Sequence, residues 1–116
     1  MKIRIKGNSL RYRLTKSDVA KLGSEGHLEE HTAFAGKTLT YIIVTTNNDT
    51  LTADYIGDKI VLNMPKIMID ELNTTDKVGF DDRNGPVSLL VEKDFTCLDQ
   101  VEEDQSDNFP NPLLNK

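Results

Sequence analysis

The first sixteen residues alternate charged and apolar side chains, a pattern typical of a β-strand with one buried face. They contain six Lys or Arg and no Asp or Glu, although the whole chain has a net charge of -5. In an extended strand, alternate residues point to the same side. The segment therefore predicts a half-buried sheet that carries a concentrated basic face.

The order of apolar and charged positions changes at Gly7-Asn8-Ser9. A β-bulge at this point would keep the apolar residues on either side of it on one face. A hairpin turn would instead place the cations on two neighbouring strands. Either interpretation gathers the same cations on one surface: Lys2, Arg4, Lys6, Arg11 and Arg13. Adjacent arginines can hold a phosphate bidentately, so these five side chains are the candidate ligands of an anion.

Two short helices are expected, at residues 16–23 and 65–73. Thr15 and Asp18 have the spacing of a capping box at the start of the first helix. Gly23 is expected to end that helix in the left-handed conformation. Pro65 fits the first turn of the second helix, where the missing N–H has no intrahelical partner to lose.

The rest of the chain is expected to form short strands separated by turns. Asn84-Gly85 is the strongest hairpin signal, because both residues tolerate positive φ. The middle of the chain predicts a meander of four antiparallel strands, at residues 28–34, 38–46, 50–56 and 59–64. The expected fold is therefore α+β, with two short helices and a curved, mostly antiparallel sheet that could form an open barrel.

Composition divides the chain into a domain and a tail. Residues 1–99 are expected to form a single α+β domain. Residues 100–116 form an acidic, Pro-containing tail that is expected to be packed on the domain or flexible. Residues 92–107 hold seven acids and one base, and this segment could cover the basic face, held there by Phe109, Leu113 and Leu114. No internal repeat is evident.

No catalytic or metal-binding constellation is expected. His27-Leu28-Glu29-Glu30-His31 matches the H-x-x-E-H spacing of a zinc protease motif, but that chemistry needs a helix and this segment predicts a strand. The segment around Asp81 and Gly85 places non-ligand residues at key positions of a calcium loop. Cys97 lies between Asp94 and Asp99, whose charges disfavour a reactive thiolate. We therefore predict no cofactor, no metal ligands and no catalytic residues.

Charge and cysteine content limit the partners and the compartment. The acidic balance argues against general nucleic-acid binding, which depends on neutralising phosphates. No apolar run approaches the roughly 20 residues of a membrane span, and the alternating N-terminal charges leave no secretory signal. Cys97 is the only cysteine, which excludes an internal disulfide. Together these features lead us to expect a cytoplasmic protein that does not act at a membrane. The strand edges of a small sheet make a homodimer a candidate assembly.

Both ends of the chain resemble one protein family. The opening, MKIRIKGNS followed by RYRLT, and the ending, EDQSDN followed by PNP, are similar to those of a family of small uncharacterised bacterial proteins, a domain of unknown function. The resemblance implies a bacterial origin. It assigns no activity and no functional residue.

The leading functional hypothesis is a non-enzymatic binding or accessory domain whose partner is unknown, with an anionic small molecule or a protein as the candidates. The alternative is a phosphate- or polyanion-binding protein, or an enzyme acting on a phosphorylated substrate, that uses the basic face. A groove lined by the five cations would favour the alternative. Burial of that face beneath residues 109–114 would favour the leading hypothesis.

Overall fold

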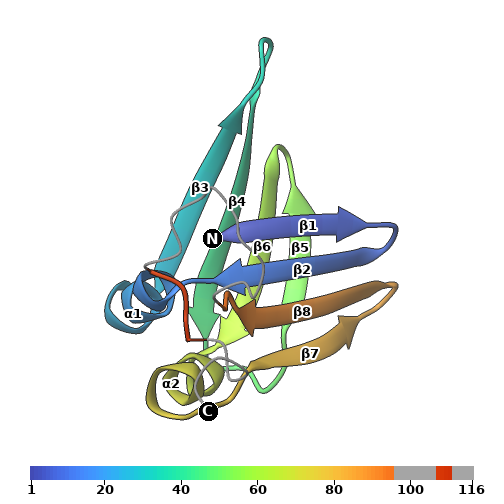
Figure 1. Cartoon of the computed structure of the whole chain (residues 1–116). Helices are drawn as coiled ribbons and strands as arrows, with labels where there is room; N and C mark the ends of the chain where they lie inside the picture. The colour runs from blue at the N-terminus through green and yellow to red at the C-terminus, as the bar shows by residue number, and fades with distance from the viewer. Residues whose placement is uncertain (96–106, 111–116) are drawn as a thin grey trace.

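Two four-stranded sheets and two short helices make up the computed structural model, which describes residues 1–95 and 107–110. Sheet A has the strand order β1 (Lys2–Lys6), β2 (Ser9–Leu14), β8 (Val87–Lys93) and β7 (Gly79–Asn84). Sheet B has the order β3 (His27–Ala33), β4 (Thr38–Thr46), β6 (Lys59–Pro65) and β5 (Thr52–Ile56). The helices α1 (Lys16–Glu25) and α2 (Lys66–Thr74) lie side by side at one end of the crossed sheets (Figure 1).

The predicted α+β class, the two short helices and the predominance of antiparallel pairing are confirmed. The strand order differs from the predicted single meander. β4 and β5 are not neighbours: β6 pairs with β4 in parallel, and β5 lies at the edge of sheet B. The two sheets do not close into a barrel. Local sequence patterns cannot reveal this order, because a strand that follows a short turn can pair with more than one neighbour.

Helix α1 begins with the predicted capping box. Thr15 Oγ1 accepts a hydrogen bond from the Asp18 N–H at 3.3 Å, and the Asp18 carboxylate accepts one from the Thr15 N–H at 3.0 Å. The helix ends at Gly26, whose φ is 79°, and the prediction that Gly23 ends it is wrong. Gly23 lies where the helices meet, and a Cβ there would come within 2.8 Å of Asn73 Nδ2. Its small size therefore permits the close approach of α2.

The core lies between the two sheets and against both helices. Tyr12 and Leu14 of β2 are fully buried, as are Leu62 and Met64 of β6. The helices, the other strands and the residue before β5 add the remaining buried apolar side chains: Val19, Leu22, Leu28, Ile43, Leu51, Ile69, Leu72, Leu89 and Val91. Each fully buried aliphatic side chain contributes about 1.5–3 kcal/mol, so this cluster is the main force that holds the hairpins in place.

The second half of the chain repeats the element order of the first. Strands β1 and β2, helix α1 and strands β3 and β4 correspond in order to β5, β6, α2, β7 and β8. Each sheet consists of two hairpins that are joined through a parallel pair of inner strands. Exchanging the two halves converts one sheet into the other, so the fold has an internal pseudo-twofold relation.

This relation extends to single residues. In the first hairpin of each half, equivalent residues are fifty positions apart, so that Lys2 pairs with Arg13 as Thr52 pairs with Asn63. Buried residues occupy equivalent places: Tyr12 and Leu62, Leu14 and Met64, Val19 and Ile69, Leu22 and Leu72. The repeat is hidden in the sequence because few equivalent residues are identical, and the core keeps only the apolar character of each position.

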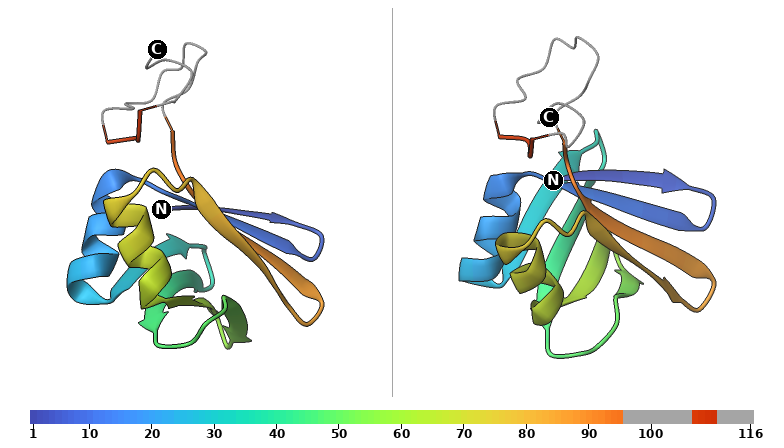
Figure 2. Two further views of the ribbon diagram at one scale, coloured as in Figure 1. Left: turned by 90° about the horizontal axis from the view of Figure 1, so that it is seen from below. Right: turned by 60° about the horizontal axis from the view of Figure 1, so that its bottom comes forward.

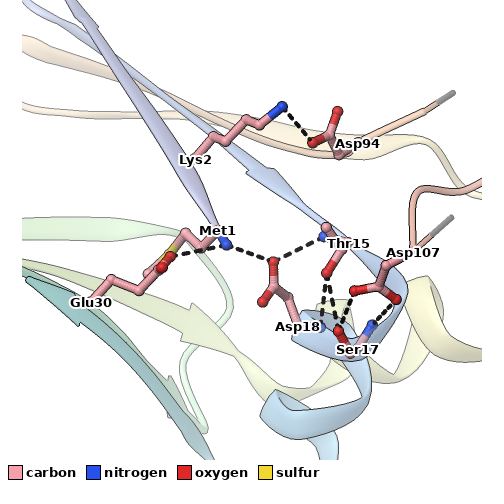
Figure 3. A network of polar contacts seen from close by, with 8 residues as sticks. All are labelled: Met1, Lys2, Thr15, Ser17, Asp18, Glu30, Asp94 and Asp107. Carbon is pink, nitrogen blue, oxygen red and sulfur yellow. Dashed lines mark hydrogen bonds and ion pairs between the residues drawn. The ribbon is translucent and has the colours of Figure 1, made fainter. Parts of the chain in front are cut away.

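Side chains connect the two sheets where the backbone ladders stop. Leu51, just before β5, donates its backbone N–H to Asp82 Oδ2 of β7 at 3.1 Å. At the equivalent place in the other half, the α-amino group of Met1 lies 2.9 Å from Glu30 Oε2 of β3 (Figure 3). The edge strand of each sheet is thus bonded to side chains of the other sheet. These bonds hold together two sheets that share no backbone pairing among the described strands.

Candidate anion-binding site

The first hairpin places all five predicted anion ligands on the outer face of sheet A. Strands β1 and β2 are joined by a turn at Gly7, whose φ is 54°, so the hairpin interpretation is correct. The register pairs Lys2 with Arg13 and Arg4 with Arg11. Residues directly opposite each other in an antiparallel pair point to the same side. The apolar residues of the hairpin alternate with these cations and lie on the opposite face, where Tyr12 and Leu14 are buried in the core and Ile5, near the turn, is exposed.

Three of the five cations are paired with resident acids. Arg11 Nη2 and Nε lie 2.5 and 2.6 Å from Glu92 Oε1, and Arg13 Nε lies 3.2 Å from the same oxygen. Lys2 Nζ lies 3.3 Å from Asp94 Oδ2 (Figure 3). Asp94 is buried and Glu92 is only 18% exposed, so water screens these pairs less than it screens fully exposed pairs. Resident acids therefore occupy one end of the basic face.

Arg4 and Lys6 form the open end of this face. Neither side chain has an ion pair with any of the described residues. Both border a groove of about 740 Å³ on sheet A. The cations and hydroxyl-bearing residues that line the groove are Arg4, Lys6, Arg11, Arg83, Ser9 and Ser88. The structure thus brings three of the five predicted ligands to one hollow and adds a fourth cation from another hairpin.

Arg83 and the two serines were not predicted as site residues, because only the pairing of strands that are distant in the sequence brings them to the groove. Ser9 of β2 pairs with Ser88 of β8, which in turn pairs with Arg83 of β7. The parallel pairing of β2 with β8 joins segments from opposite ends of the domain. The Asn84-Gly85 hairpin signal could place Arg83 beside a turn, but it carried no information on which strand would lie next to β8.

Two acids, Asp81 and Asp82, also line the groove and reduce its positive charge. The Asp82 carboxylate is engaged by backbone donors: Oδ2 accepts from Leu51 and Oδ1 from the N–H of Arg83, the latter at 2.9 Å. Asp81 lies on the outer face of β7, opposite Leu90. Four cations therefore face two acids around the groove, and one of these acids is already held by hydrogen bonds.

The pseudo-twofold relation provides an internal comparison for the basic face. The equivalent positions on the outer face of sheet B are occupied by Thr52, Asp54, Ile56, Val61 and Asn63. The strand pairing is the same there, yet none of these residues is a cation. Arg4 lies directly opposite Arg11, and like charges in such a pair disfavour the sheet. The same strand pairing forms in sheet B without these cations, and the closeness of the cations to one another does not stabilise sheet A.

The described part of the tail packs against the start of α1. The Asp107 carbonyl oxygen accepts from the Lys16 N–H at 3.1 Å, and its carboxylate accepts from both the hydroxyl and the N–H of Ser17 (Figure 3). The Ser17 hydroxyl is the main cause that lowers the pKa of Asp107. The hypothesis that the tail covers the basic face concerns mainly residues 100–106 and 111–116, which lie outside the described residues.

The histidine motif lies on a strand, as predicted. His27 and His31 belong to β3, so the H-x-x-E-H spacing does not form a helical zinc motif. His31 Nε2 lies 3.2 Å from Glu29 Oε2, and its Nδ1 lies 2.9 Å from Thr40 Oγ1. Within residues 1–95 and 107–110, no group of three or more His, Cys, Asp or Glu is placed to hold a metal ion. Cys97 lies outside the described residues.

Residues 1–113 match the model of a protein family that is described as a family of unknown function, DUF7009. The chain belongs to this family. The resemblance to a domain of unknown function is thereby confirmed. No curated protein and no solved structure gives a significant match to this DUF7009 chain.

Neither of the helices in its described part is long and apolar enough to cross a membrane.

Proposed function

We propose that this protein is a non-enzymatic binding module whose ligand is a phosphate-bearing anion, held in the groove on sheet A. The proposal depends on one observation: Arg4 and Lys6 border the groove without an acidic partner among the described residues. Arg83 and Ser88 extend the same lining from the second hairpin. The cations are thus concentrated around a hollow that can receive a ligand.

The groove offers donors that suit phosphate. The planar guanidinium of Arg4 can bind two phosphate oxygens at once, and the Lys6 ammonium adds a compact positive charge. The Ser88 hydroxyl can donate a further hydrogen bond. The Ser9 hydroxyl already donates to the Lys6 carbonyl oxygen at 2.7 Å, so it fixes the hairpin turn rather than the ligand.

An anion in the groove would also reduce the repulsion between neighbouring cations of this face. Arg4 and Arg11 are opposite each other in the register, and of these two only Arg11 forms an ion pair with a described acid. A phosphate between Arg4 and Lys6 would neutralise the two cations that form no ion pair with the described residues. Binding should therefore stabilise the folded protein, because the ligand interacts with the folded state alone.

The side chains around the groove favour binding over catalysis. The described lining contains no His, the side chain most often used as a general base, so no imidazole is present to activate Ser9 or Ser88 as a nucleophile. Of its two carboxylates, that of Asp82 is bonded to backbone N–H groups. We therefore propose a protein that retains the anion without converting it.

The test is a titration of the isotope-labelled protein with inorganic phosphate and with tripolyphosphate, followed by backbone amide shifts in NMR spectra. We expect shifts centred on β1 and on the β7–β8 hairpin, together with a rise in melting temperature. Arg4→Ala should weaken binding about 10- to 150-fold, since a hydrogen bond to a charged group is worth roughly 1.5–3 kcal/mol. Arg4 is exposed, so this variant should keep its fold.

Lys59→Ala is the matched control, because Lys59 is an exposed cation on the outer face of sheet B. It should leave the affinity for phosphate unchanged. An equal loss in both variants would reveal general charge attraction and would overturn the proposed site. Failure of the wild-type protein to bind either anion would also overturn it. So would binding of duplex DNA without binding of the small anions.

A further inference from the structure

An apolar cleft opens between the two sheets, at the end away from the helices. The sheets diverge in this direction (Figure 2). The cleft measures about 420 Å³, which lies within the range of about 300–1,000 Å³ that is usual for small-molecule sites. Most of its lining consists of pseudo-twofold pairs: Ile5 with Tyr55, Leu10 with Ile60, and Val87 with Leu39.

The mouth of the cleft exposes large apolar side chains that the fold does not bury. Ile5 is 57% exposed and Tyr55 is 76% exposed. Asp54 is the one charged residue of the described lining, and its carboxylate accepts a hydrogen bond from Asn63 at 3.0 Å on the outer face of sheet B. The interior of the cleft therefore suits an uncharged hydrocarbon group.

The apolar cleft and the cationic groove lie next to each other, on the two sides of the first hairpin. Leu10 contributes to the lining of both. Ile5 borders the cleft while its neighbour Lys6 borders the groove, because successive residues of a strand point to opposite faces. β1 is the edge strand of sheet A, so a ligand can pass around it from one face to the other.

We infer that the anion has an apolar chain, so that the ligand class is an alkyl or acyl phosphate. Its phosphate lies near Arg4 and Lys6, and its chain passes Ile5 to fill the cleft beside Tyr55. This inference rests on the proposed phosphate site and adds the hydrocarbon part of the ligand. The charge of the groove and the apolar lining of the cleft are complementary to the two ends of such a molecule.

The test compares inorganic phosphate with hexyl, octyl and decyl phosphate, each titrated by calorimetry below its critical micelle concentration. We expect the affinity to rise about three- to fourfold per methylene until the cleft is filled, which corresponds to about 0.8 kcal/mol for each buried methylene. Octanol, which has the same chain as octyl phosphate without the phosphate, should bind much more weakly.

Two variants separate the chain from the phosphate. Tyr55→Ser should remove most of the gain with chain length and leave the affinity for inorganic phosphate unchanged. Ile67→Ser is the matched control, since Ile67 is an exposed apolar residue of α2 that is absent from the described lining of the cleft. It should change neither affinity.

The outcomes distinguish this inference from the proposed function on which it rests. Equal affinities for inorganic phosphate and octyl phosphate would overturn the inference that the ligand has an apolar chain, and would leave the proposed phosphate site intact. If octanol bound as tightly as octyl phosphate, the groove would contribute nothing to the affinity for octyl phosphate. That result would also overturn the inference that one ligand occupies both the groove and the cleft. If no phosphate of any chain length binds, the proposed function itself fails.

Discussion

The backbone N–H of Leu51 donates to Asp82 Oδ2 at 3.1 Å and so ties the start of β5 in sheet B to β7 in sheet A. Met1 and Glu30 form the equivalent contact in the other half of the molecule, with an ammonium in place of the amide. These are side-chain bonds at places where a closed barrel would have a backbone ladder. They explain how two separate sheets can enclose one core.

Asp82→Ala should lower the free energy of unfolding by about 1–3 kcal/mol, because it leaves the N–H of the buried Leu51 without its acceptor. Chemical denaturation followed by circular dichroism measures the change. Asp81→Ala is the control on the same strand, where the side chain is exposed, and it should cost less than about 0.5 kcal/mol. Equal effects of the two variants would show that the bond between the sheets contributes nothing particular.

Stability should fall as the pH rises above about 8, because of the α-amino group of Met1. Burial opposes its charge, but ion pairs with Asp18 at 2.8 Å and with Glu30 outweigh burial and raise its pKa above the usual 8.0. The raised pKa gives stabilisation that is complete below the unfolded value and is lost as the pH passes through the folded value.

Urea denaturation between pH 7 and 10 measures this loss, and Glu30→Gln provides the comparison. The variant should be less stable than wild type at pH 7 and should lose less stability on going to pH 10, since one of the two ion pairs is already absent. Parallel curves for the two proteins would contradict the assignment of the pH dependence to this amine.

Gly79→Ala should destabilise the protein by roughly 1–3 kcal/mol, because there is no space for a side chain. A Cβ at this position would come within 2.3 Å of the Val91 carbonyl oxygen and 2.8 Å of Glu92 Cα. Gly36→Ala, in a position with nothing within 4 Å of the added carbon, is the control. Thermal denaturation should show a lower melting temperature for the first variant only.

Glu92→Gln should strengthen phosphate binding about three- to tenfold, equivalent to roughly 1 kcal/mol, because it frees the positive charges of Arg11 and Arg13. Glutamine keeps the size of the side chain and one acceptor oxygen. Calorimetric titration with tripolyphosphate measures the effect. An unchanged affinity in Glu92→Gln, alongside a reduced one in Arg4→Ala, would show that Arg11 takes no part in binding the anion and that the charge of the nearby Arg13 has no effect.

Features that depend on neighbouring residues were predictable from the sequence. The alternation in residues 1–16 correctly indicated one basic and one apolar face, and the spacing of Thr15 and Asp18 correctly indicated a capping box. In both cases the backbone geometry of one strand or one helix turn decides the outcome. The prediction for Gly23 failed because contact with Asn73, fifty residues away, uses that glycine for close packing.

Arg83 shows why the candidate site was only partly predictable. Its place in the groove follows from the parallel pairing of β2 with β8, which no pattern near residue 83 encodes. Within residues 1–95 and 107–110, Arg4 and Lys6 form no ion pair, which likewise depends on where β8 brings Glu92. The cations of the first hairpin were predictable from the sequence, whereas the pairing of distant strands determines which cations border the groove.

Local sequence patterns were enough to predict the two helices and the gathering of cations on one surface, because these follow from the direction of side chains along a single element. They left a bulge and a hairpin open at Gly7, and tertiary packing was needed to establish the hairpin, the strand order, the internal repeat, the groove and the adjacent apolar cleft. These features arise when distant hairpins bury a shared core. Burial in the shared core requires apolar side chains at equivalent positions of the two halves. It places no such requirement on the outer faces of the sheets, which therefore differ between the halves.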